Sequence, residues 1–132
     1  MANNDNLKEF KIVLLGESGV GKTSIIQRYT KDKFEDEQIP TKCASFDTKI
    51  IKLDEFIESY IKLNIWDTAG QEKYRALSKI FYKEASAAIL VYDITNKKSF
   101  EEIKDYWYNQ VKECSQENTN KYKLYLSYFF IK

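Results

Sequence analysis

Gly16-Glu17-Ser18-Gly19-Val20-Gly21-Lys22-Thr23 is the stretch that decides the fold of this chain. It matches the P-loop pattern, in which a glycine and four free positions precede glycine, lysine and threonine or serine. Glycines let the backbone turn tightly, so that successive N–H groups point at phosphate oxygens. Lys22 adds a positive charge beside those oxygens, and Thr23 offers a hydroxyl to Mg²⁺. The stretch therefore predicts a cradle for the phosphates of a nucleotide.

The residues on either side of the loop favour this prediction over a chance match. Residues 10–15 form an apolar run typical of a buried strand, and residues 23–29 have the character of a helix. The N-terminus of that helix would face the phosphates and favour their negative charge. The residues predicted to contact the nucleotide are Gly16, Glu17, Ser18, Gly19, Val20, Gly21, Lys22, Thr23 and Ser24.

Composition limits the classes of function. The chain has 132 residues, of which 43% are hydrophobic and 31% are charged, as expected for one globular domain. A formal net charge of +1 predicts no general attraction to nucleic acid or to anionic lipid. The absence of histidine, and the lack of metal-ligand spacing between Cys43 and Cys114, exclude zinc chemistry and histidine-based catalysis. The polar first residues and the short apolar run at 85–91 predict a cytoplasmic protein without a signal peptide or membrane span.

A long loop and two strands follow the first predicted helix. Residues 31–41 are charged and show no periodicity, which predicts an exposed loop of the kind that is often functional. Residues 44–53 and 60–66 alternate between polar and apolar, which predicts an antiparallel hairpin whose turn begins at Asp54. Residues 87–92 form a continuous apolar run, as expected of a central parallel strand.

The next segment predicts an amphipathic helix. Ser99-Phe100-Glu101-Glu102 has the pattern of a capping box, with Ser99 as the N-cap. Four apolar residues would share one face of this helix: Phe100, Ile103, Trp107 and Val111. Residues 122–132 can form a further strand. The order of elements predicts an α/β fold with a doubly wound, mostly parallel sheet, one antiparallel edge hairpin, and a ligand site at the carboxyl ends of the strands.

Asp67 and Gly70 follow directly on the predicted strand at 60–66. A carboxylate in that place can hold Mg²⁺ through water, and a glycine N–H can approach a terminal phosphate without obstruction by a side chain. Asp-Thr-Ala-Gly is also an ordinary turn sequence, so this motif by itself leaves both interpretations open.

Three motifs together resemble those of the Ras superfamily and, within it, the Rab small GTPases. They are the P-loop, Trp66-Asp67-Thr68-Ala69-Gly70-Gln71-Glu72, and Leu90-Val91-Tyr92-Asp93-Ile94-Thr95-Asn96. The resemblance covers residues 8–111, and the Gly-Glu-Ser opening of the P-loop is similar to that of endosomal Rabs. It implies a GTP hydrolase that binds GTP or GDP with Mg²⁺ and acts as a molecular switch in vesicle-mediated protein transport.

The resemblance also implies roles for individual residues. Thr23, Thr41 and Asp67 would be the Mg²⁺ ligands, with Thr41 closing on the metal only in the GTP state. Lys22 would bind the β- and γ-phosphates, and Gln71 would orient the attacking water, a task that needs no titrating side chain. The implied catalytic residues are thus Gln71, Lys22 and Thr41.

Two segments would change with the bound nucleotide: switch I at about 33–46 and switch II at about 67–82. Within switch I, Phe34 would pack over the guanine base. Each role has a structural alternative, because Thr41 can be a turn residue after proline, Phe34 a core anchor for its loop, and Gln71 a surface glutamine.

Phe46, Trp66 and Phe81 match an aromatic triad that Rabs present to their effectors. The resemblance implies that effectors, exchange factors and GTPase-activating proteins bind at the surface of the two switches. The spacing of these aromatics is equally compatible with a partly buried core. Membrane association, on the cytosolic face of endomembranes, would require a full-length prenylated form.

The last third of the chain departs from the family pattern. The Asn-Lys-x-Asp motif that reads guanine is absent, since residues 96–99 and 120–123 begin with Asn-Lys but lack the aspartate. The resemblance therefore implies that residues 1–132 are one incomplete small GTPase domain, lacking the last strand and helices. The alternative is a truncated, non-catalytic fragment that binds nucleotide weakly or unselectively. A general P-loop ATPase or nucleotide kinase is disfavoured by residues 66–72.

Overall fold

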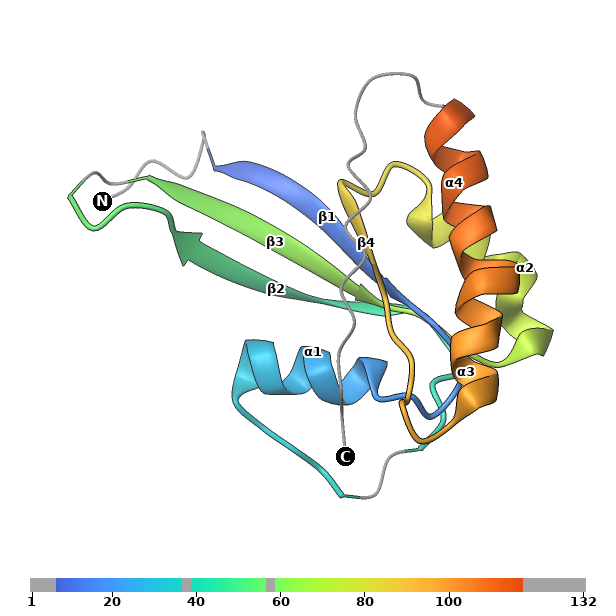
Figure 1. Ribbon diagram of the computed structural model, residues 1–132. Helices are drawn as coiled ribbons and strands as arrows, with labels where there is room; N and C mark the ends of the chain where they lie inside the picture. Colours follow the sequence, from blue (N-terminus) through green and yellow to red (C-terminus); the bar gives the residue numbers. More distant parts are fainter. Residues whose placement is uncertain (1–6, 37–38, 57–58, 118–132) are drawn as a thin grey trace.

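Figure 1 shows the computed structural model, which describes residues 7–36, 39–56 and 59–117. Its strands are β1 (Lys8–Leu15), β2 (Ser45–Lys52), β3 (Tyr60–Asp67) and β4 (Ala87–Leu90). Its helical segments are α1 (Lys22–Lys31), the short 3₁₀ turn η2 (Glu72–Tyr74), α2 (Arg75–Tyr82), α3 (Lys97–Glu102), the π-helical stretch η3 (Ile103–Trp107) and α4 (Tyr108–Glu117).

The described strands form one mixed sheet in the order β2-β3-β1-β4. β1 pairs in parallel with both β3 and β4, whereas β2 pairs antiparallel with β3. The predicted antiparallel hairpin at the edge of a parallel sheet is therefore confirmed. β4 lies at the other edge of this described sheet, and the further strand predicted for residues 122–132 lies outside the described residues.

Helices cover both faces of the sheet, as the doubly wound prediction requires. In Figure 1, α1 lies on one face, while α2 and the continuous segment α3–η3–α4 lie on the other. Two clusters of buried side chains fill the two layers. The α1 side contains Leu14, Val20, Ile26, Ile65 and Val91. The opposite side contains Val13, Leu15, Tyr82, Ala85, Ala88, Leu90, Ile103, Trp107, Val111 and Cys114.

The apolar run at the end of β1 explains why this strand is central. Successive side chains of a strand point to opposite faces, so Val13 and Leu15 enter one layer and Leu14 enters the other. All three are at most 1% exposed. Because these consecutive positions are all apolar, the end of β1 can be buried on both faces of the sheet. The loop that follows β1 therefore leaves from a central strand that is packed on both sides.

The predicted capping box was wrong. α3 begins at Lys97, with Asn96 at the N-cap position, and Ser99 lies inside the helix. The buried Ser99 hydroxyl donates to the Asn96 carbonyl (2.7 Å) and accepts from the Asp93 N–H (3.0 Å). Its bonding capacity is therefore used to hold the turn between β4 and α3, which a pattern based on a free helix end does not anticipate.

Phe100 was also wrongly assigned to the buried face of this helix. It is 36% exposed, and its ring lies 5.0 Å from that of Tyr92 rather than in the core. Ile103, Trp107 and Val111 are buried as predicted. The capping box implied a helix that begins at Phe100, whereas α3 begins three residues earlier, at Lys97.

Other predicted elements agree with the structure. The helix predicted for residues 23–29 corresponds to α1. Asp54 begins the hairpin turn, where its carboxylate accepts a hydrogen bond from the Phe56 N–H at 2.7 Å. The search for membrane-spanning helices, made over the described part of the chain, found none that is long and apolar enough.

Replacement of Leu14 by alanine should lower the free energy of unfolding by about 2–5 kcal/mol, because a 1% exposed leucine leaves a cavity between β1 and α1. Leu53, which is 59% exposed, provides the same chemical change outside the core. Leu53→Ala should therefore change the free energy by less than about 0.5 kcal/mol. Urea denaturation measures the free energy of unfolding of both variants. Equal decreases in the two variants would contradict the buried position of β1.

Candidate functional site

The P-loop joins the end of β1 to the start of α1, as predicted. Gly16 has a φ of +150°, and a Cβ placed there would lie 2.1 Å from the Val91 carbonyl oxygen. The obstacle is backbone at the end of β4, so it cannot rotate away. The first glycine of the motif is therefore required by the close approach of the loop to the neighbouring strand.

Lys22 lies at the base of this loop and is only 5% exposed. Its Nζ donates to the carbonyl oxygens of Gly16 (2.9 Å) and Glu17 (2.7 Å). Burial lowers the pKa of Lys22 to about 8, although the nearby carboxylates of Asp67 and Glu17 oppose this shift. The loop thus encloses one ammonium group whose present partners are neutral carbonyls, and anionic phosphate oxygens would be stronger partners.

Three oxygen-bearing side chains from different segments meet beside Lys22. Thr23 Oγ1 donates to Asp67 Oδ2 at 2.6 Å, and the Thr41 hydroxyl lies 2.9 Å from Thr23 Oγ1. Because the single Thr23 proton is directed at Asp67, the Thr41 hydroxyl must be the donor in the second contact. The structure therefore brings together all three residues that were predicted as metal ligands, from α1, the loop before β2 and the end of β3.

The geometry of Asp67 fits a cation. Its side chain is buried, and its Oδ1 has no hydrogen-bond partner among the described residues. Burial raises the pKa of Asp67, with the Thr23 hydrogen bond and the Lys22 charge opposing the shift. A buried carboxylate with one unpaired oxygen is costly unless a positive group lies against it. Mg²⁺ prefers oxygen ligands of this kind.

The described residues contain no group of three or more acidic or cysteine side chains that could enclose a metal. The two hydroxyls and one carboxylate of this site are too few to coordinate a metal ion by protein atoms alone. Mg²⁺ commonly keeps several waters and takes further ligands from substrate phosphates, so two hydroxyls and one carboxylate are sufficient protein contributions. The site therefore fits Mg²⁺ held together with a phosphate-bearing ligand.

A pocket of about 370 Å³ lies over the P-loop, a volume within the range of small-molecule sites. Of the predicted residues, its lining includes Ser18, Gly19, Val20, Gly21, Lys22, Thr23, Ser24, Phe34, Thr41 and Gly70. The lining also includes five residues that sequence reasoning missed: Glu35, Asp36, Ile39, Pro40 and Asp93. For Asp93 a signal existed, because this carboxylate follows an apolar run in the same way that Asp67 follows β3.

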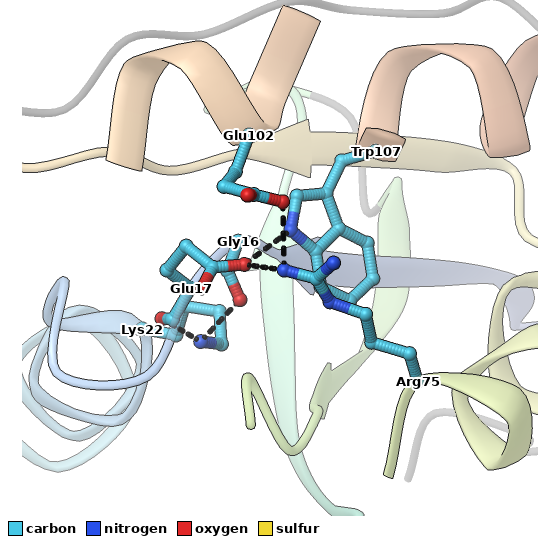
Figure 2. A network of polar contacts seen from close by, with 6 residues as sticks. All are labelled: Gly16, Glu17, Lys22, Arg75, Glu102 and Trp107. Atoms are coloured by element: carbon cyan, nitrogen blue, oxygen red, sulfur yellow. Dashed lines mark hydrogen bonds and ion pairs between the residues drawn. The ribbon is translucent and has the colours of Figure 1, made fainter. Parts of the chain in front are cut away.

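The remaining predicted residues lie next to the pocket lining. Gly16 is buried behind the loop, and Asp67 lies beneath Thr23. Glu17 contributes its backbone carbonyl to Lys22, but its side chain points away from the lysine toward Arg75 and Trp107 (Figure 2). The predicted contact of Glu17 with the nucleotide would therefore come from its backbone, and it stays a prediction.

The comparisons with known proteins now identify the family. A family profile described as "Ras family" matches residues 11–125 of the chain. The chain belongs to the Ras family. The match extends beyond residue 111, where the resemblance noted in the sequence ended, and it covers the P-loop, the Thr41 loop and the end of β3.

The chain is also similar to individual Ras-related proteins of the Rab group. It is 47% identical over 104 residues to Ras-related protein Rab-21 of Homo sapiens, an alignment that spans 79% of this chain and 44% of the relative. It is 42% identical over 109 residues to Ras-related protein RABA1b of Arabidopsis thaliana, spanning 83% of this chain and 49% of the relative. The chain thus spans somewhat less than half the length of these relatives.

The segment that follows β3 lies directly against the P-loop of this Ras-family chain. A Cβ on Gly70 would lie 2.4 Å from both the Glu17 carbonyl carbon and the Ser18 nitrogen. Thr68, which is fully buried, donates from Oγ1 to the Leu14 carbonyl at 2.6 Å. Gln71 follows immediately and accepts the Tyr74 N–H at its backbone oxygen (2.9 Å), where η2 begins.

Two of the open alternatives can now be compared with positions in the structure. Phe34 is 55% exposed and lines the pocket, so it is not a core anchor. Phe46 and Trp66 are register partners on β2 and β3, with ring centroids 4.9 Å apart, and Trp66 lies 5.6 Å from Phe81 of α2. Phe46 is 55% exposed, whereas Trp66 and Phe81 are half-buried. The triad is therefore a partly exposed aromatic cluster that joins the hairpin to α2.

Substitution of Gly16 by alanine should destabilise the chain more than the same change at Gly19. Both glycines have positive φ, so both variants incur the left-handed strain of about 1–2 kcal/mol. Only the Gly16 Cβ meets backbone, whereas nothing lies within 4 Å of a Cβ on Gly19. We expect Gly16→Ala to cost about 1–3 kcal/mol more in urea denaturation, which is the scale of overpacking. Equal costs would disprove the close approach to β4.

Proposed function

We propose that this chain carries the nucleotide-binding and hydrolytic part of a Rab-type molecular switch, which binds GTP and GDP with Mg²⁺ and hydrolyses GTP. The observation that carries the proposal is the cluster of Thr23, Thr41 and Asp67 at the edge of the P-loop pocket. The unpaired buried oxygen of Asp67 supports a cation in this cluster. Family membership supports the choice of a guanine nucleotide.

The side chains of the site would act on the phosphates in distinct ways. Lys22 would exchange its two carbonyl partners for phosphate oxygens and so place a positive charge beside the bond that breaks. Mg²⁺, when bound, would supply electrostatic stabilisation of the charge that develops on the phosphate oxygens. Gln71 would orient the attacking water from the segment that Gly70 holds against the P-loop. No proton-transferring histidine is required.

Thr41 would connect the nucleotide state to the surface of the protein. Its hydroxyl reaches Thr23 from the loop between α1 and β2, so Thr41 lies at the pocket. Mg²⁺ and the γ-phosphate of GTP would give Thr41 further partners there, and loss of the γ-phosphate would remove them. The loop leads directly into β2, where Phe46 begins the aromatic cluster with Trp66 and Phe81. We propose that effectors, exchange factors and GTPase-activating proteins distinguish the two states at this cluster.

We further propose that the whole protein acts in vesicle-mediated transport on the cytosolic face of endomembranes, as a Rab relationship implies. A second candidate function is a fragment that binds phosphates without selecting the base. The observation that favours it is the lack of an Asn-Lys-x-Asp motif anywhere in the 132 residues. Competition between nucleotides separates these two functions.

The deciding experiment titrates the purified chain with fluorescent GDP, with and without Mg²⁺, and then competes it with GTP or ATP. The switch function predicts Mg²⁺-dependent binding that GTP displaces and ATP does not. Equal displacement by both nucleotides would favour the unselective fragment, and the absence of binding would reject the proposed function for this chain.

Asp67→Asn should weaken the Mg²⁺ dependence of GDP binding, because the amide keeps an acceptor for Thr23 but removes the negative charge. We expect the effect of adding Mg²⁺ to fall by about tenfold, since a hydrogen-bonded or coordinated charge contributes about 1.5–3 kcal/mol. Asp105→Asn, at an exposed position of η3, is the matched control and should behave like the unsubstituted chain. Unchanged Mg²⁺ dependence in Asp67→Asn would remove Asp67 from the metal site.

Gln71→Leu should slow single-turnover GTP hydrolysis on the order of 100-fold, the scale on which mispositioning of a reactant slows an enzyme. The affinity for GDP should change little, because Gln71 is not among the residues that line the pocket. Hydrolysis is followed by separation of the nucleotides over time. A variant that hydrolyses GTP at the original rate would show that the water is oriented by another residue.

A further inference from the structure

Arg75, the first residue of α2, joins three segments that lie far apart in the sequence. Its Nη2 donates to a carboxylate oxygen of Glu17 in the P-loop and to Glu102 Oε2 in α3, the latter at 2.8 Å. Figure 2 shows the guanidinium between the two carboxylates. Trp107 of η3 adds a third contact, since its Nε1 donates to the same Glu17 oxygen at 3.3 Å. We call these four residues the Arg75 clamp.

The clamp is sheltered from water by aromatic rings. The Arg75 Cζ lies 4.4 Å from the centre of the Tyr106 ring and 5.6 Å from that of Trp107. The side chains of Arg75 and Glu17 are 18% and 17% exposed. Ion pairs at this depth are screened less by solvent and salt than those at the surface, so the contact should contribute more than an exposed pair does.

One nitrogen of Arg75 serves both carboxylates, and the Nε atom is buried without a hydrogen-bond partner among the described residues. The guanidinium is therefore not used in the bidentate geometry that gives the strongest arginine–carboxylate pairs.

Arg75 lies at the N-terminal end of α2, so the clamp determines how this end of the helix is held. Lys73, Ala76, Lys79 and Ile80 around it are exposed, so they do not hold this end of α2 to the body of the protein. The other end is anchored by buried Tyr82, whose hydroxyl donates to Gln110 of α4 at 3.3 Å. Arg75 is thus a polar anchor of the α2 N-terminus, four residues after Gln71.

Glu17 connects the clamp to the phosphate site. Its backbone carbonyl accepts from Lys22 Nζ, and its carbonyl carbon lies 2.4 Å from where a Cβ on Gly70 would be. The same residue therefore touches the P-loop lysine, the segment that carries Gln71, and the clamp arginine. A displacement of Arg75 would be transmitted to these groups through a single residue.

We propose that Arg75 is a positioning residue, which fastens the segment carrying Gln71 to the P-loop and to α3 so that Gln71 is held beside the pocket. The expected effect of Arg75 on GTP hydrolysis rests on the proposed function. The contact itself is a property of the chain without nucleotide and can be tested separately.

The first test is amide hydrogen exchange, measured by mass spectrometry on the nucleotide-free chain. Arg75→Gln should make peptides within residues 71–82 exchange about tenfold faster, because the stability of local opening falls when a charged hydrogen bond is lost. Lys79→Gln is the matched control, since it removes an exposed charge from the same helix. Equal exchange in these two variants overturns the proposal. Unchanged exchange in β1 and α1 verifies that the fold is intact.

Glu102→Gln provides a second variant if Arg75→Gln does not fold. It should loosen the same peptides in the same direction, whereas Glu101→Gln, which only breaks an exposed pair with Lys97, should not. If Glu102→Gln and Glu101→Gln give the same exchange pattern, α3 does not take part in the clamp and the proposal is rejected.

The second test separates positioning from stability. In single-turnover hydrolysis at saturating GTP, Arg75→Gln should slow GTP cleavage about tenfold, because the placement of Gln71 changes. Faster exchange combined with an unchanged hydrolysis rate would overturn the positioning role. If the unsubstituted chain binds no guanine nucleotide, the proposed function fails, and the exchange comparison alone decides whether the clamp exists.

Discussion

The parallel pairing of β1 with β3 is the constraint on which the whole site depends. Its register places Leu14 opposite Asp67, so the P-loop and the segment after β3 leave the sheet at the same edge. The hydrogen bonds from Thr68 to the Leu14 carbonyl and from Thr23 to Asp67 then follow from this proximity. Parallel pairing by itself places the carboxyl ends of neighbouring strands side by side. Ligand sites of α/β proteins form at such edges.

Much of this arrangement could be predicted from the sequence because it depends on backbone pattern. The apolar run of β1, the glycine-rich loop and the alternation of β2 and β3 each predict an element from a local sequence pattern. Once the elements are ordered, topology determines that Thr23 and Asp67 lie close together. Thr41 was harder, since no periodicity describes its loop, and only the family resemblance indicated that it would reach Thr23.

The parts that could not be predicted depend on the orientation of side chains. Glu17 belongs to the P-loop motif, yet nothing in the motif indicates that its carboxylate turns toward Arg75, 58 residues away. Ser99 has the sequence of an N-cap but bonds to the backbone around Asp93. The partner of Glu17 comes from a distant segment whose position is set by packing of the helices on the sheet, whereas the partners of Ser99 come from the irregular turn between β4 and α3. Local patterns carry no information about such partners.

The different roles of Glu17 explain why motif position alone is a poor guide to chemistry here. Its backbone serves the phosphate loop, while its side chain serves the contact between that loop and two helices. A partly buried carboxylate in a loop that binds anions would oppose phosphate binding unless its charge were neutralised. Arg75 supplies that neutralisation, and Glu102 in turn shares the same guanidinium. The acidic residue of the P-loop is therefore compatible with a phosphate site because α2 lies against it. The position of α2 brings the positive charge of Arg75 to Glu17, so the packing of this helix also determines the net charge beside the phosphate site.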